Sequence, residues 1–138
     1  MKLIDLGAVR RVDDTGGDIY GSKGYSAPEA TSNPTPVSDL YTVGRALAVL
    51  VASFDFQGKY EHSLPAADEC PAFKEHEALY RFLLKATRAK EDERFQTAAE
   101  MATSLRRFLR DHAAMTEARR RRQLRERRLA NRWRSAIR

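Results

Sequence analysis

The residues best suited to chemistry lie near the start of the chain, where one acid is followed by several hydroxyl groups. Asp5 ends the short apolar run of residues 2–4, and a carboxylate there can cap a turn or supply an anionic oxygen ligand. A hydroxyl can carry a phosphoryl group, which orders a loop when a cationic partner is near. Candidate hydroxyls for such a modification in the segment after Asp5 are those of Thr15, Tyr20, Ser22 and Ser26.

The composition excludes several other kinds of site. Cys70 is the single cysteine, so the sequence holds neither an internal disulfide nor the Cys/His spacing of a zinc site. The longest apolar stretch, residues 46–52, is far shorter than the roughly 20 residues that cross a bilayer. The first residues do not form a signal peptide. These features predict a cytoplasmic protein in a reducing compartment, without a transmembrane segment.

The formal net charge of +6 comes from one end of the chain. Residues 117–138 contain ten Arg and two Glu, a net charge of +8, while residues 1–116 contain 15 basic and 17 acidic side chains, a net charge of −2. The distribution predicts a nearly neutral globular body followed by a basic tail.

The pattern of apolar residues predicts a mainly α-helical fold with a short β-ribbon. Residues 2–4 and 9–12 form the predicted ribbon, which is marginal in water unless it packs on something. Residues 13–24, rich in Asp, Gly and Ser, are expected to be an exposed loop. Ser38 is the predicted N-cap of a helix over residues 40–53, which is apolar on all sides and therefore expected to be buried.

Two further helices are expected to surround this buried one. Residues 73–87 carry apolar side chains at helical spacing on one face, which predicts an amphipathic helix. Thr97 and Glu100 form a capping box at the start of the next helix. The apolar stripe behind the box consists of Met101, Leu105, Phe108 and Leu109.

Four motifs, in this order, resemble the carboxy-terminal half of the protein-kinase domain. They are DLG at residues 5–7, GSKGYSAPE at 21–29, SDLYTVGR at 38–45 and EDERF at 91–95. The wording KLIDLGAV and DLYTVGRALAVL is most similar to the actinobacterial protein kinase G branch of the serine/threonine kinases. The resemblance covers residues 1–112, which implies a partial kinase C-lobe, and residues 113–138 are a helical or disordered arginine-rich tail.

The resemblance assigns a role to the acid and to part of the hydroxyl-rich segment. Asp5 takes the place of the magnesium-binding aspartate of the DFG motif, with Leu6 replacing the usual Phe, so Mg²⁺ and ATP are the implied cofactors. The alternative is that Asp5 only ends a strand. Ser22, Gly24 and Tyr25 match the pocket for the substrate hydroxyl, with Ser22 favouring serine or threonine over tyrosine. The alternative for the candidate phosphorylation sites is that these hydroxyls belong to a flexible polar loop that is not phosphorylated.

Three more residues gain structural roles from the resemblance. Glu29 and Arg94 match a buried ion pair that ties the activation segment, residues 5–29, to the helical lobe. Asp39 matches the aspartate that anchors the catalytic loop. The alternative for Asp39 is a first-turn acid favoured by the helix dipole.

Several kinase parts have no counterpart in this sequence: the glycine-rich loop, the strand lysine and its helix glutamate, and the catalytic loop with its Asp and Asn. The resemblance places them before residue 1, in a missing kinase lobe. Without them we expect no phosphotransfer by this chain alone, exposed apolar surface, and a marginal, aggregation-prone fold.

Two functions are therefore considered. The first is a fragment of a serine/threonine kinase, an enzyme that transfers the ATP γ-phosphate to Ser or Thr of protein substrates. The second is a non-catalytic, pseudokinase-like interaction module, whose tail binds an acidic partner, an anionic membrane or nucleic acid. The alternatives for the tail are a solvated helix extension and a sequence read past a frameshift. Its basic residues are Arg119, Arg120, Arg121, Arg122, Arg125, Arg127, Arg128, Arg132 and Arg134.

Overall fold

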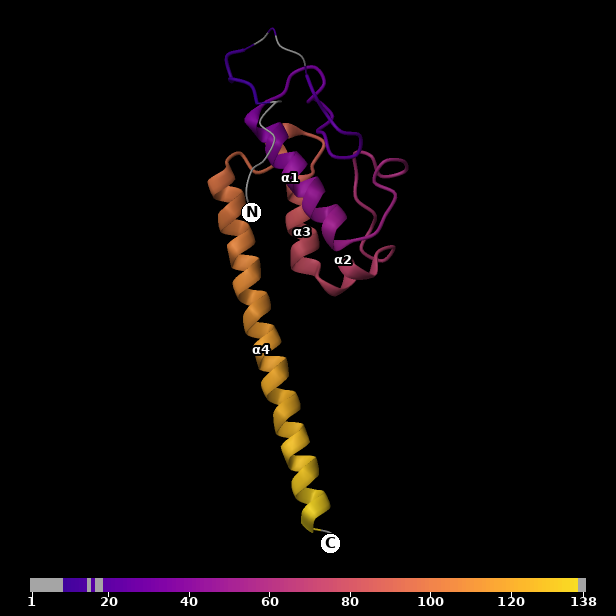
Figure 1. Cartoon of the computed structure of the whole chain (residues 1–138), viewed down its shortest axis with the longest axis vertical. Helices are drawn as coiled ribbons and strands as arrows, with labels where there is room; N and C mark the ends of the chain where they lie inside the picture. Colours follow the sequence, from indigo (N-terminus) through magenta and orange to yellow (C-terminus); the bar gives the residue numbers. More distant parts are fainter. Residues whose placement is uncertain (1–8, 15, 17–18, 137–138) are drawn as a thin grey trace. The chain divides into compact units, whose positions relative to one another are not determined.

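The computed structural model describes residues 9–14, 16 and 19–136, and within these residues it contains helices and no strand. Figure 1 shows the order of the helices along the chain. The chain forms two compact units, Met1–Thr103 and Ser104–Arg138. The helices are α1 (Pro36–Val51), α2 (Pro71–Glu75), α3 (Glu77–Ala86), the 3₁₀ helix η1 (Glu91–Glu93) and α4 (Ala98–Ala136).

The predicted β-ribbon is wrong where the structure describes it. Residues 9–12 form no strand, and the Asp14 N–H donates to the Arg11 carbonyl at 3.1 Å, which makes a turn. Val9 and Val12 are 71% and 86% exposed, so this segment lacks the packing that an isolated two-stranded ribbon needs. The other run, residues 2–4, lies outside the described residues.

Helix α1 begins earlier than predicted, because its N-cap is Thr35 and not Ser38. The Thr35 hydroxyl accepts from the N–H groups of Val37 and Ser38 at 3.2 and 3.3 Å. Ser38 completes the capping box by accepting from the Thr35 N–H at 3.1 Å. Pro36 at the first helical position has its backbone already set for the helix, which favours this earlier start.

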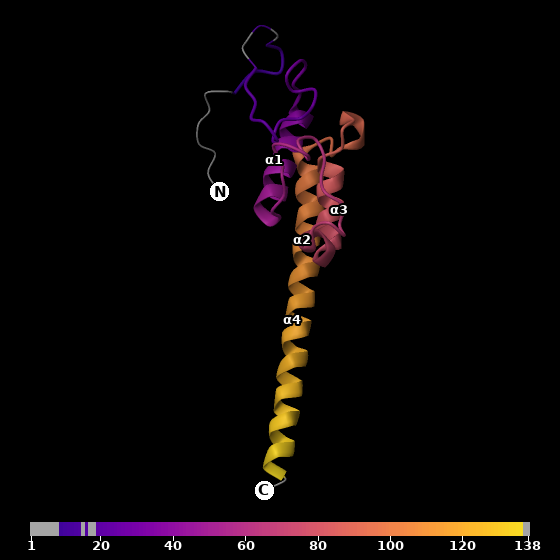
Figure 2. The same ribbon diagram turned by 90° about the vertical axis from the view of Figure 1, so that its right-hand side faces the viewer.

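One face of α1 is buried, and the expectation of burial on all sides is wrong. Tyr41, Gly44, Arg45 and Ala48 share the buried face at helical spacing. α1 and α3 lie side by side in Figures 1 and 2, with a close approach at Gly44, where an added Cβ would lie 2.7 Å from the Ala86 Cβ. The opposite face exposes apolar surface, as expected: Val43 and Leu50 are 55% and 81% exposed.

The predicted helix over residues 73–87 is two helices, α2 and α3. His76 separates them with φ −119° and ψ 62°, outside the helical region. Phe73 and Tyr80 nevertheless stack across the break with ring centroids 4.9 Å apart. The buried residues of α3, which form the core with α1, are Leu79, Phe82, Leu83 and Ala86.

Helix α4 starts at the predicted capping residues. The Thr97 hydroxyl accepts from the Glu100 N–H at 3.1 Å, while the Glu100 carboxylate reaches back to the Gln96 N–H at 3.0 Å, one residue before the expected partner. The helix then continues without interruption to Ala136, so residues 113–136 are helical. No helix in the described part of the chain combines the length and the hydropathy needed to span a membrane.

Candidate functional site

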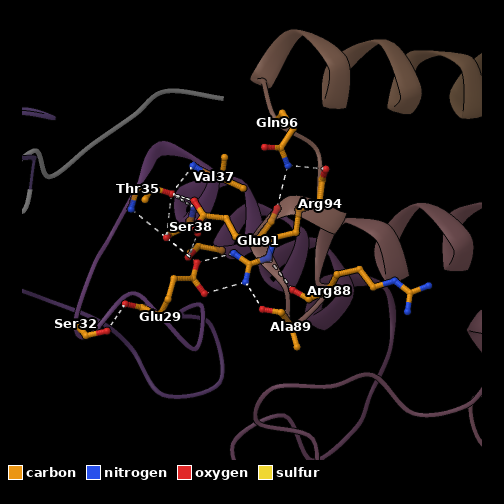
Figure 3. A network of polar contacts seen from close by, with 11 residues as sticks. Glu29, Ser32, Thr35, Val37, Ser38, Arg88, Ala89, Glu91, Arg94 and Gln96 are labelled. Atoms are coloured by element: carbon orange, nitrogen blue, oxygen red, sulfur yellow. Dashed lines mark hydrogen bonds and ion pairs between the residues drawn. The ribbon is translucent and has the colours of Figure 1, made fainter.

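The best defined polar centre is a two-point ion pair between Glu29 and Arg94, shown in Figure 3. Arg94 Nη1 donates to Glu29 Oε1 at 2.6 Å, and Arg94 Nη2 donates to Oε2 at 2.8 Å. The Arg94 side chain is fully buried and that of Glu29 is 22% exposed. Two parallel charge-assisted bonds fix the geometry as well as the contact. The pair therefore fastens the loop that precedes α1 to the segment that follows η1.

Further hydrogen bonds extend the ion pair into a network. Arg94 also donates to the carbonyls of Arg88 at 2.6 Å and Ala89 at 2.8 Å. Glu29 Oε1 accepts from the Ser38 hydroxyl at 2.8 Å. The hydrogen bond from Arg94, against a smaller opposing effect of burial, lowers the pKa of Glu29 from 4.5 to about 2. The carboxylate is thus ionised at neutral pH, and both of its oxygens accept from Arg94.

Tyr41 lies against this pair on the buried face of α1. The Arg94 guanidinium carbon lies 4.8 Å from the centre of the Tyr41 ring, within the range of a cation–π contact. Burial raises the pKa of Tyr41, and its hydroxyl has no hydrogen-bond partner among the described residues. The ring thus joins the ion pair to the core of the first unit.

Arg45 organises a second centre, which the sequence pattern did not predict. Its side chain is fully buried on α1, where burial lowers its pKa. It donates to the Gly24 carbonyl at 2.7 Å, the Tyr60 carbonyl at 2.7 Å, the Phe56 carbonyl at 3.3 Å and the Ser63 carbonyl. These backbone dipoles solvate the charge, so one arginine ties the loop of residues 54–63 to Gly24. Arg45 lies four residues after Tyr41, on the same face of the helix, and this spacing was the sequence signal that could have predicted its burial.

The loop that contains the predicted substrate pocket lines an open hollow of about 360 Å³ together with Glu61 and His62. Ser22 lines it with Lys23, Gly24 and His62. Gly24 has φ +82°, and an added Cβ would lie 2.4 Å from the Phe56 carbonyl oxygen, so only glycine fits there. The Arg45 hydrogen bond and this close approach together fix the backbone beside Ser22.

The other members of the predicted pocket are placed by local contacts. The Tyr25 ring meets the Phe56 ring edge-on, with centroids 5.1 Å apart. The Ser26 hydroxyl accepts from the Ser22 N–H at 2.9 Å and donates to its carbonyl at 3.2 Å. Tyr20 is 70% exposed. Of the hydroxyls predicted to be phosphorylatable, those of Tyr20 and Ser22 belong to exposed residues, and that of Ser26 belongs to a half-buried residue engaged within the loop.

Asp39 is exposed in the first turn of α1. The predicted magnesium ligand Asp5 and the predicted phosphosite Thr15 lie outside the described residues. Within the described part of the chain, no three His, Cys, Asp or Glu side chains come close enough together to hold a metal ion. The described residues thus supply the loop and its anchors, and not a metal centre.

Comparison with known proteins shows what this chain is similar to. No family model matches the chain. It is 40% identical over 116 residues to the serine/threonine-protein kinase PknG of Mycolicibacterium smegmatis (strain ATCC 700084 / mc(2)155), and equally to that of Mycobacterium leprae (strain TN). Over these 116 residues the chain resembles a segment of the PknG-type serine/threonine kinases. Each match covers 83% of this chain, and the chain spans about 15% of the length of each PknG protein.

The match confirms the predicted resemblance to the protein kinase G branch.

Proposed function

We propose that this chain is the part of a serine/threonine kinase that holds the activation segment against the helical lobe. In the complete enzyme, the ATP γ-phosphate would pass to a Ser or Thr hydroxyl of a protein substrate. The chain alone would not catalyse this transfer, because its sequence contains no match to the ATP-binding loop, the strand lysine or the catalytic loop.

The observation that carries this proposal is the Glu29–Arg94 ion pair, in a chain that is 40% identical to PknG. The pair joins two residues that are 65 positions apart in the sequence. A separate hydrogen bond, from Arg45 to the Gly24 carbonyl, fixes the loop beside Ser22. A protein hydroxyl entering the hollow near Ser22 would meet a pre-formed backbone, so its orientation would cost little entropy.

Asp5 is the residue that the proposal assigns to magnesium, and Mg²⁺ would neutralise the ATP phosphates. Ser22 and Gly24 are assigned to positioning the acceptor hydroxyl, and Asp39 to holding the catalytic loop of the complete lobe.

The experiment is a chimera in which this chain replaces the matching 116 residues of the M. smegmatis kinase. We expect transfer of labelled phosphate from ATP to protein, and we expect Asp5→Asn in the chimera to abolish it. Asp14→Asn, a nearby exposed acid, serves as the matched control and should keep the activity. A folded chimera without activity, or equal loss in both variants, would contradict the proposal.

A further inference from the structure

The carboxy-terminal half of α4 carries arginines around its whole circumference. Arg119 to Arg122 are four consecutive residues, and successive helical residues point about 100° apart, so their side chains surround the axis. These four residues are exposed, and so are Arg125, Arg127, Arg128 and Arg132. Eight guanidinium groups are thus distributed along about 20 Å of helix.

Few acids neutralise this charge. Glu117 pairs with Arg121 at 2.9 Å, and Glu126 pairs with Arg122 at 3.0 Å. Both pairs are exposed, and such pairs contribute little because water and salt screen them. Within the part of the chain that the structure describes, the other six arginines form no ion pair, so their charge is available to a partner.

The placement of the apolar residues argues against a helix that lies on a bilayer. A membrane-surface helix needs a continuous apolar face. Leu124 and Leu129 are 47% and 56% exposed, and they are five residues apart, which places them about 140° from each other around the helix. Arginines stand between them on both sides. Over residues 119–132 this helix presents charge in every direction and no apolar face.

The same distribution fits a groove with anionic walls on both sides. The major groove of B-form DNA is about 12 Å wide, and a helix with its side chains is about 10–12 Å across. Duplex DNA carries one negative charge per roughly 1.7 Å of its axis, so 20 Å presents about twelve phosphate charges to these eight arginines. A helix in the groove could therefore contact the phosphates of both strands at once.

We propose that residues 119–132 of α4 bind duplex DNA through its phosphates, without sequence preference. Arginine suits phosphate because its planar fork can donate two parallel hydrogen bonds. Phosphate contacts position a protein and carry no sequence information. Residues 113–138 contain a single aromatic residue, Trp133, whereas single-strand binding uses a series of aromatic residues on which successive bases stack, which favours a duplex over a single strand. This proposal does not depend on phosphotransfer by the complete kinase.

The test is fluorescence anisotropy of a labelled DNA duplex of about 20 base pairs, titrated with the full 138-residue chain between about 50 and 200 mM salt. We expect micromolar binding and a plot of log K against log salt with a slope near −5, since each neutralised phosphate contributes about −0.9. Replacing Arg121, Arg125, Arg128 and Arg132 by Gln should weaken binding about tenfold or more and make the slope less negative by about 3.

Two control variants test whether the position and the charge of the replaced residues determine the loss of binding. Gln at Lys59, Lys74, Arg81 and Lys90 removes the same charge from exposed positions outside α4 and should leave the slope unchanged. Lys at the four α4 positions keeps the charge and should retain most of the binding. If the Gln variant at the α4 positions loses its helix, the Lys variant still tests whether the positive charge of these residues is what binds DNA.

Three results would overturn the proposal. The first is the absence of binding at about 50 mM salt. The second is an equal loss of binding in both Gln variants. The third is tighter binding to phosphatidylserine vesicles, to duplex RNA or to single strands than to duplex DNA, each measured by competition against the labelled duplex.

Discussion

Removal of Arg94 is the substitution that most severely tests the described structure. Arg94→Ala removes the two hydrogen bonds that Arg94 donates to the Glu29 carboxylate. It also removes the hydrogen bonds that Arg94 donates to the carbonyls of Arg88 and Ala89. Breaking a buried pair by removing one partner costs about 3–5 kcal/mol. The lowered pKa of Glu29 agrees in direction, because the hydrogen bond from Arg94 stabilises the charged carboxylate.

The assay is thermal unfolding followed by circular dichroism. For a unit of this size, about 3 kcal/mol corresponds to a decrease in Tm of roughly 12 °C. Arg94→Lys keeps the charge but loses the two-point geometry, so an intermediate decrease is expected. The matched control is Arg81→Ala, which breaks an ion pair to Glu77 whose side chains are 74% and 69% exposed. That control should change the Tm by about 2 °C or less.

A double-mutant cycle separates the ion pair from the other contacts of Arg94. If the two side chains act through each other, Glu29→Ala and Arg94→Ala together destabilise by less than the sum of the single variants, with a coupling of about 2 kcal/mol or more. An unchanged Tm in Arg94→Ala, or additive effects in the cycle, would refute the role given to this pair.

Three further predictions follow from the same structure. Because the pKa of Glu29 is lower in the folded state, its stabilisation should be complete above about pH 4.5 and lost as the pH falls towards 2, a dependence that Glu29→Gln should reduce in pH-dependent melting curves. Arg45→Met should release the loop of residues 54–63, seen as faster proteolysis there, whereas Lys74→Met should not. Gly24→Ala should lower the Tm by several degrees, because its Cβ would meet the Phe56 carbonyl, whereas Gly16→Ala, with open space around it, should not.

The sequence indicates the helical fold best where periodicity and capping residues agree. Thr97 and Glu100 mark the start of α4 because a hydroxyl and a carboxylate at that spacing satisfy free N–H groups locally. At α1 the same logic selected Ser38, but Thr35 precedes Pro36, and the proline allows the helix to begin there. Local sequence patterns therefore predict where a helix lies. They do not fix its first residue when two nearby residues can each serve as the N-cap.

The parts that the sequence did not predict depend on contacts between distant residues. The break at His76 has no Pro or Gly to mark it, and Phe73 still stacks on Tyr80 across it. Arg45 was overlooked because its partners are backbone carbonyls, which any residue supplies and no motif records. Glu29 and Arg94 were paired through motifs of a known family, since nothing local links residues 65 positions apart.

The measurement that tests the central claim most directly is the intact mass of this protein in its own cell, after capture with an antibody against residues 104–138. We expect a polypeptide several hundred residues long, in which these residues form one segment of a kinase. A product of 15.7 kDa would contradict the proposed function, because that chain has no match to the ATP-binding and catalytic-loop motifs.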